Sequence, residues 1–130
     1  MEEKVIPKII KENCLDFDWD NKKVWKIKAP VEKMNIDELK WQFDFPFWHS
    51  SSQKYTITPN QVFQKPGKYK EQYERVMKSD LKHPIDIMKN KKKLWEILDG
   101  LHRLAKAHLL KYEEVNVRKI LKEKIPEISK

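Results

Sequence analysis

Glycine is scarce in this chain, and the place of one glycine constrains the fold more than any other feature. The 130 residues contain two glycines, Gly67 and Gly100. Gly100 stands directly between an apolar run at residues 94–98 and a run with apolar residues at helical spacing that begins at Leu101. Glycine tolerates a positive φ and lets a ligand approach the backbone closely. The pattern therefore predicts a strand, a tight turn and a helix over residues 95–112.

The first residues of this expected helix favour an anionic ligand. A helix N-terminus carries unpaired backbone amides and about half a unit of positive charge from the helix dipole. A phosphate placed there would meet the amides of Gly100, Leu101 and His102. The guanidinium of Arg103, which is expected to face solvent, and the imidazole of His102 would add side-chain donors. Asp99 is expected to cap the helix, unless a metal ion or a substrate hydroxyl lies between its carboxylate and the anion.

The periodicity elsewhere predicts a small mixed sheet with helices. Alternation of apolar and polar residues, or a short apolar run, predicts strands at residues 24–29, 85–87, 94–98 and 115–119. Helical spacing or a capping pattern predicts helices that begin near Asn35, Thr58, Lys68 and Leu101. The order β, α, α, α, β, β, α, β is typical of an α+β fold, so a single domain over residues 1–130 is expected.

Composition excludes a membrane-spanning chain and favours an anionic partner. Charged residues make up 37% of the chain, the mean hydropathy is −0.83, and no apolar run approaches the roughly 20 residues that span a bilayer. The first residues lack the pattern of a signal peptide, which favours a cytoplasmic protein with no membrane partner. Residues 1–64 carry 10 basic and 10 acidic groups, whereas residues 65–130 carry 18 and 10. Such a basic half attracts nucleic acid, nucleotides or phosphorylated metabolites, and a solvated lysine-rich surface is the plain alternative.

Sulfur and imidazole groups do not form a metal-binding pattern. Cys14 is the only cysteine, and a single cysteine is more often a small core residue than a nucleophile. The histidines lack the i, i+4 spacing of a helical zinc site: they are His49, His83, His102 and His108. No protein-held metal is therefore expected, while a magnesium ion brought by a nucleotide is compatible with the sequence.

Residues on both sides of the glycine turn resemble the ParB N-terminal domain and sulfiredoxin superfamily. Residues 84–87 read PIDI, residues 95–107 read WEILDGLHRLAKA, and residues 114–117 read EVNV. These runs are similar to the superfamily's Pro-Ile strand, its strand that ends in Gly-x-x-Arg before a helix, and its short closing strand. The resemblance, which extends roughly over residues 74–120, implies a ParB/sulfiredoxin-like fold. It also implies that Gly100, His102 and Arg103 hold the phosphates of ATP or CTP.

Departures from the superfamily narrow the activity that the resemblance implies. Sulfiredoxins place their catalytic cysteine directly after the glycine, where this chain has Leu101, so sulfinic acid repair is not expected. Partition proteins continue with a helix-turn-helix, for which the residues after Ile120 are too few, so chromosome partitioning is not expected either. Short members of the superfamily include archaeal free serine kinases, which use the same turn with acidic residues as base and metal partners.

The resemblance thus implies a nucleotide- or phosphate-ligand-binding domain with two alternative functions. One is an ATP- or ADP-dependent phosphotransferase, such as a small-molecule kinase or a nucleotidase, that uses a nucleoside tri- or diphosphate with magnesium. Asp44, Asp86 and Asp99 are its candidate catalytic bases or metal partners. The other is a non-enzymatic ParB-like nucleic-acid-binding or regulatory module. Nucleic-acid binding would then be weak, sensitive to salt and independent of sequence.

An aromatic-rich segment at about residues 44–70 looks like an insertion relative to the superfamily pattern. Pro46 ends the preceding helix pattern, and Phe47 and Trp48 follow it. Aromatic side chains on such a segment form a lid that stacks on a nucleotide, or they anchor the segment to the core. Anchoring is the favoured alternative, and both residues remain candidates for a lid.

Overall fold

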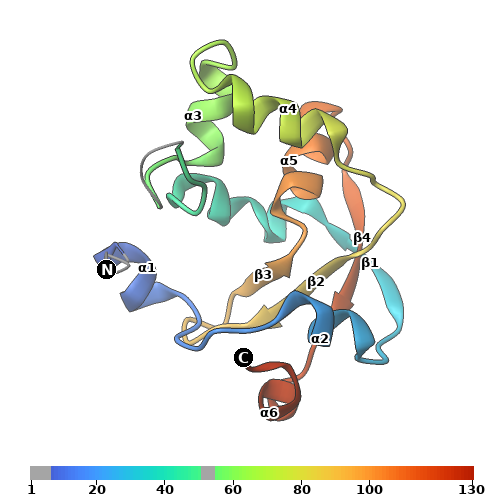
Figure 1. Ribbon diagram of the computed structural model, residues 1–130. Coiled ribbons are helices and arrows are strands. Elements are labelled where there is room, and N and C mark those ends of the chain that lie inside the picture. The colour runs from blue at the N-terminus through green and yellow to red at the C-terminus, as the bar shows by residue number, and fades with distance from the viewer. Residues whose placement is uncertain (1–6, 51–54) are drawn as a thin grey trace.

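The computed structural model describes residues 7–50 and 55–130, which form an α+β fold on one four-stranded mixed sheet (Figure 1). The strand order is β1-β4-β2-β3. The strands are β1 (Val31–Asn35), β2 (Ile85–Lys89), β3 (Trp95–Asp99) and β4 (Glu114–Lys119). β4 pairs antiparallel with β1 and parallel with β2, and β2 and β3 form an antiparallel hairpin. The expected α+β class with a small mixed sheet is confirmed.

Helices lie on both faces of the sheet (Figure 1). One face carries α3 (Pro59–Gln64), α4 (Lys70–Lys78), α5 (Leu101–Leu109) and two 3₁₀ helices, η1 (Ile36–Glu38) and η2 (Lys40–Asp44). The other carries α2 (Asn21–Lys26) and α6 (Ile125–Ile128), and η3 (Lys122–Lys124) leads directly into α6. α1 (Lys8–Asn13) lies near the turn of the β2–β3 hairpin, where Lys91 bonds its backbone. Within residues 7–50 and 55–130, no helix combines the length and apolar character that crossing a membrane requires.

Alternation along the strands divides the core into two clusters. Ile85 and Ile87 of β2 face the larger cluster, which includes Leu104 of α5. Met88 points the other way and packs with Val24 of α2. Because successive side chains of a strand point to opposite faces, the burial of Ile85 to Met88 shows that β2 is covered on both faces. Each fully buried aliphatic side chain contributes about 1.5–3 kcal/mol to folding.

Helix α3 begins as the sequence predicts. The hydroxyl of Thr58 accepts a hydrogen bond from the Gln61 amide at 3.1 Å, and Gln61 Oε1 accepts one from the Thr58 amide at 2.8 Å. Pro59 occupies the first helical position, where its missing N–H is not needed. This reciprocal pair is a capping box, so the expectation at Thr58 is confirmed.

The strand expected at residues 24–29 is wrong. Asp20 caps a helix there, because its carboxylate accepts a hydrogen bond from the Lys22 amide at 2.8 Å. Val24 and Ile27, three residues apart, both contact the smaller cluster, and this spacing fits a helix. The alternation of apolar and polar residues in the same segment fits a strand equally well, so the sequence alone does not distinguish the two. The first strand begins only at Val31, after Pro30.

The helix expected after Asn35 is present only as the 3₁₀ helices η1 and η2. Asn35 still caps it, through a hydrogen bond from the Asp37 amide at 2.8 Å. The second 3₁₀ helix places Gln42 beside the outer edge of β3, where it accepts from the Ile97 amide at 2.8 Å and donates to the Trp95 carbonyl at 3.2 Å. Gln42 thus pairs two backbone groups of a strand edge that would otherwise be open to another chain, and Nε1 of Trp41 also donates to the Trp95 carbonyl at 3.1 Å.

Candidate functional site

The turn between β3 and α5 has the conformation that its glycine predicts. Gly100 has φ 117° and ψ 19° and precedes the first residue of α5. A side chain rarely adopts this left-handed conformation. A Cβ atom at this position would also lie 2.9 Å from Nη2 of Arg103 and 3.2 Å from Cγ1 of Ile85. The backbone conformation therefore requires glycine, and the close approach of Arg103 and Ile85 favours it further.

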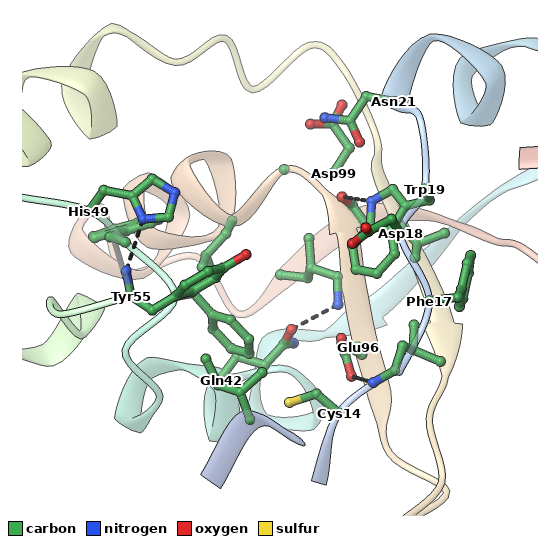
Figure 2. Close-up of a pocket in the computed structure, with 18 of the residues that line it drawn as sticks. Cys14, Phe17, Asp18, Trp19, Asn21, Gln42, His49, Tyr55, Glu96 and Asp99 are labelled. Carbon is green, nitrogen blue, oxygen red and sulfur yellow. Dashed lines mark hydrogen bonds between the residues drawn. The ribbon is translucent and has the colours of Figure 1, made fainter. Parts of the chain in front are cut away.

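The N-terminus of α5 opens into a groove of about 870 Å³ (Figure 2). Residues 96–102 of β3 and α5 form one wall. Most of residues 14–21, which lead from α1 to α2, form a second wall, and Phe47, Trp48, His49 and Tyr55 form a third. The first amides of any helix lack intrahelical partners. The groove therefore meets the part of α5 that is best suited to an anion.

Charge in the groove is mixed rather than uniformly basic. Lys11, Arg75 and Lys130 supply cations. The carboxyl groups come from four residues: Asp16, Asp18, Glu96 and Asp99. The excess of positive charge in the chain is therefore not concentrated in the groove. An anion in the groove would depend on the helix N-terminus and on individual cations such as Arg75.

Asp99 lines the groove, but the expectation that it caps α5 is wrong. The helix has no side-chain cap. Instead, Oδ2 of Asp99 accepts a hydrogen bond from Nε1 of Trp25 at 2.7 Å and lies 3.4 Å from Nη2 of Arg103. The charge of Arg103 offsets part of the negative charge of the carboxylate, which reduces its repulsion of an anion. Trp25 is on α2, and the interpretation of that segment as a strand concealed this contact.

The guanidinium of Arg103 is not the solvent-facing group expected from the sequence. Its side chain is 16% exposed and is ion-paired with Asp99. Within the part of the chain that the structure describes, its buried Nε atom has no hydrogen-bond partner. The residue lines a second cavity of about 460 Å³ together with Ile85 and Tyr112, whereas it does not line the groove. The side chain of Arg103 therefore packs against the turn on the side away from the groove.

The imidazole of His102 is held by two neighbours. Its ring stacks on Trp48, with centroids 4.5 Å apart and an interplanar angle of 13°. Its Nε2 atom lies 2.8 Å from Oε1 of Gln72 on α4. Burial, and then the nearby charge of Arg75, lower the pKa of His102 to about 4, against a smaller upward effect of Asp99. At neutral pH the ring is uncharged, and its Nε2 atom is engaged by Gln72 rather than free to donate to a phosphate.

Asp86 is buried and does not reach the groove. Its side chain is 3% exposed and forms an ion pair of 2.6 Å with Nε of Arg118. Arg118 also donates to the carbonyls of Ile27 at 2.6 Å and Val24 at 3.0 Å, so it ties the end of α2 to the sheet. Burial raises the pKa of Asp86, and Arg118 opposes that effect. Asp86 is paired with Asp99 across β2 and β3.

Asp44 lies apart from the other two candidate aspartates. Its Oδ1 accepts a hydrogen bond from Nδ2 of Asn60 at 2.5 Å, which links η2 to α3. Asp44 lines neither cavity. The structure thus brings Asp86 and Asp99 together, and of the three only Asp99 reaches the groove. Among residues 7–50 and 55–130, no group of three or more histidine, cysteine, aspartate or glutamate residues could hold a metal ion.

The two candidate lid residues differ in burial. Trp48 is 5% exposed and belongs to the larger core cluster. Its backbone forms a bridge with Ile57, with hydrogen bonds of 3.1 Å in both directions. Phe47 is partly buried against the same cluster and lines the groove. This arrangement favours the anchoring alternative for Trp48 and leaves Phe47 at the groove wall.

Cys14 lies at the end of the groove beside Glu96, a pair that sequence reasoning did not identify (Figure 2). Burial, and then Glu96, raise the pKa of the Cys14 thiol to about 12. Burial also raises the pKa of Glu96, whose Oε1 accepts hydrogen bonds from the Leu15 amide at 2.9 Å and from Asn90 at 3.2 Å. The contacts are a structural junction between the segment after α1 and β3. The core role expected for Cys14 agrees with its burial.

Comparisons of the chain with protein-family models, with curated proteins and with solved structures found no match. Gln72 and Trp25, which position His102 and Asp99, stand out in the geometry of the groove and carried no signal in the sequence. Both act through contacts between segments that lie far apart in the chain.

Proposed function

We propose that the chain binds a phosphorylated ligand, in the first place a nucleoside di- or triphosphate, at the N-terminus of α5. One observation carries the proposal. A nine-residue helix, preceded by a glycine at φ 117°, begins at the wall of a groove of about 870 Å³. Helix N-termini bind phosphate through backbone amides and the helix dipole. The groove is in the size range of small-molecule sites, roughly 300–1,000 Å³.

Aromatic walls make a nucleotide the favoured phosphorylated ligand. Phe17, Phe47 and Tyr55 line the groove. Aromatic surfaces bind a planar base by stacking. The resemblance to the ParB and sulfiredoxin superfamily supports the same ligand class. In this proposal Gly100, Leu101 and His102 contribute backbone amides, and Arg103 fixes the turn that presents them.

Phosphoryl transfer is the finer form of the proposal. Catalysis of this reaction depends on positioning and on neutralisation of charge. Asp99 is the candidate that lines the groove, so we assign it the role of base or of partner to a nucleotide-bound magnesium ion. Asp86, buried in its ion pair with Arg118, would act only through the position of β2.

A ligand screen with one charge-reversal pair tests the proposal. The melting temperature should be measured with ATP, ADP, CTP, GTP and sugar phosphates, each with magnesium. It should rise for at least one nucleotide, because a ligand at 100 times its Kd stabilises the folded protein by about 2.7 kcal/mol. Arg75→Glu should weaken that binding, since Arg75 lines the groove. Lys78→Glu, which makes the same charge change on the same helix away from the groove, should bind as the wild type does. No shift with any phosphorylated compound, or an equal loss in both variants, would refute the proposal.

A second candidate function is binding of single-stranded nucleic acid, and one observation favours it. Trp25 is 57% exposed although Asp99 fixes its orientation through Nε1. Lys22, Lys26 and Lys28 surround it in the sequence and form no ion pair within residues 7–50 and 55–130. Exposed aromatics flanked by cations bind bases by stacking and the backbone by charge.

Oligonucleotide titrations decide on this second candidate. Trp25→Ala should weaken binding of a single-stranded oligonucleotide, and the affinity should fall steeply with salt. Trp25→Phe, which keeps an aromatic face, should retain most of the affinity. Oligonucleotide affinities that are equal in wild type and Trp25→Ala would exclude this surface.

A further inference from the structure

The contacts of Gln72 determine which ring nitrogen of His102 carries a proton. Nε2 of Gln72 donates a hydrogen bond to the carbonyl of His49 at 2.8 Å. The other side-chain atom of Gln72, Oε1, therefore lies 2.8 Å from Nε2 of His102. Exchanging the two atoms of the amide would place its oxygen against the carbonyl oxygen of His49. Because an amide oxygen only accepts, Nε2 of His102 must carry the hydrogen.

The other ring nitrogen of His102, Nδ1, carries a lone pair, and the residue lines the groove. The ring is neutral near pH 7, so only one of its nitrogens is protonated. Within residues 7–50 and 55–130, Nε of Arg103 is the only buried side-chain nitrogen or oxygen atom without a hydrogen-bond partner. Nδ1 of His102 makes no hydrogen bond there, so it is accessible to solvent, and its residue lines the groove. His102 is the second residue of α5, so this unpaired acceptor belongs to the first turn of the helix.

Burial keeps this ring neutral over the pH range of interest, and the charged groups near it do not reverse that effect. α4 contributes Arg75, which lowers the pKa of His102, and β3 contributes Asp99, which raises it less. His49 and Tyr55 line the same groove. Because burial is the largest effect and the pKa is about 4, the lone pair persists from pH 5 upward. Nδ1 becomes a donor only when the pH falls through about 4.

We propose that Nδ1 of His102 faces the anion site and selects ligands that carry an O–H or N–H donor beside their anionic group, such as a phosphate that retains one proton or a phosphate next to a hydroxyl. The inference rests on the proposed function, because it concerns the same anion site. Amides at the start of α5 attract any oxyanion. Nδ1 opposes an unprotonated oxygen, since two lone pairs then face each other, and it accepts a hydrogen bond from a protonated one.

Methyl phosphate and methyl sulfate form a matched pair of probes. At pH 5 both are monoanions of nearly the same size, and only methyl phosphate has an O–H group. Its second proton dissociates with a pKa of about 6. NMR titrations followed at the amides of residues 101–103 should show methyl phosphate binding tighter at pH 5, on the order of ten-fold, the equivalent of one hydrogen bond. That advantage should shrink at pH 8, although methyl phosphate is then doubly charged. Attraction by charge alone predicts the opposite trend.

His102→Phe removes the acceptor and retains an aromatic ring to stack on Trp48. In this variant the affinity for methyl phosphate at pH 5 should fall to that for methyl sulfate. Nitrogen chemical shifts of the wild-type ring, measured without ligand at pH 6, should show Nε2 protonated and Nδ1 unprotonated. A proton on Nδ1, or equal affinities for the two probes at pH 5, would overturn the role of His102 while leaving the anion site in place. Failure of both probes to bind at either pH would reject the anion site, and this inference with it.

Discussion

Arg103 folds back toward Asp99, so that its Nη2 atom lies 3.4 Å from Oδ2 of that carboxylate. Gly100 lies between the two residues in sequence, and the guanidinium occupies the space beside its missing side chain. Glycine followed three residues later by arginine thus has a structural explanation inside the fold. The glycine makes room for the arginine, and the arginine holds the carboxylate that precedes the helix.

Gly100→Ala should lower the free energy of unfolding by about 1–3 kcal/mol, the usual cost of a strained backbone conformation. The physical reasons are the φ of 117° and the 2.9 Å approach to Arg103. Urea denaturation measures the change. Gly67→Ala is the matched control, because its added Cβ would meet nothing within 4 Å. Equal stabilities of the two alanine variants would contradict this account of the turn.

Arg103→Ala should make Gly100→Ala less damaging. The collision of the new Cβ with the guanidinium disappears in the double variant, whereas the strain at φ 117° stays. The two changes should therefore be non-additive by at least about 0.5 kcal/mol, as expected for residues in contact. A double-mutant cycle from denaturation curves gives this value. Additive effects would mean that the guanidinium moves aside freely.

The second half of the fold could be predicted because each of its elements carries a local signal. β2, β3 and β4 show apolar alternation or short apolar runs, and Gly100 marks the start of α5. The N-terminal third could not, because Val24 and Ile27 fit a strand and a helix alike. Asp20 decides between them by capping the helix.

Of the candidate site, the sequence predicts the backbone conformation but not the orientations of the side chains. The turn conformation at Gly100 follows from the residue type. The orientations of Arg103 and His102 do not, because they depend on Asp99, Gln72 and the stack with Trp48. Such contacts join segments that are distant in sequence, so a pattern along the chain does not reveal them.

The stability of Glu96→Gln relative to the wild type should increase as the pH rises from 4 to 7. Burial raises the pKa of Glu96 above its usual 4.5. Its contribution is therefore fully present below pH 4.5 and is lost as the pH rises through the raised pKa. Glutamine keeps an oxygen for the Leu15 amide and for Asn90 and has no charge to bury. Melting temperatures of both proteins across this range test the prediction, and a difference that does not change with pH would contradict it.

The thiol of Cys14 should be unreactive toward a maleimide at pH 8 in the folded protein and reactive after denaturation. It is 1% exposed and its pKa is raised to about 12, so the nucleophilic thiolate is scarce. Mass spectrometry before and after addition of denaturant measures the labelling. Cys14→Ser should leave any ligand binding or turnover unchanged. Loss of activity without unfolding would give the thiol a functional role instead.

Replacing Trp48 and Phe47 separately distinguishes a fixed wall from a mobile lid. Trp48→Ala should lower the free energy of unfolding by about 3–5 kcal/mol, the cost of truncating a large core side chain. Trp48 is 5% exposed and stacks on His102 at 4.5 Å, so its loss opens the core and frees the ring at the start of α5.

Phe47→Ala provides the contrast, because Phe47 is only partly buried and lines the groove. This variant should lose less stability than Trp48→Ala and should bind a nucleotide more weakly if the base stacks on that wall. Under the lid hypothesis, Trp48→Ala instead keeps its melting temperature and loses affinity, since a lid contributes to the bound state alone. Paired melting and calorimetric titrations of both variants separate the two outcomes. The stack on His102 would then be a contact made only on closure, and an unchanged melting temperature for Trp48→Ala would require Trp48 to leave the core in the free protein.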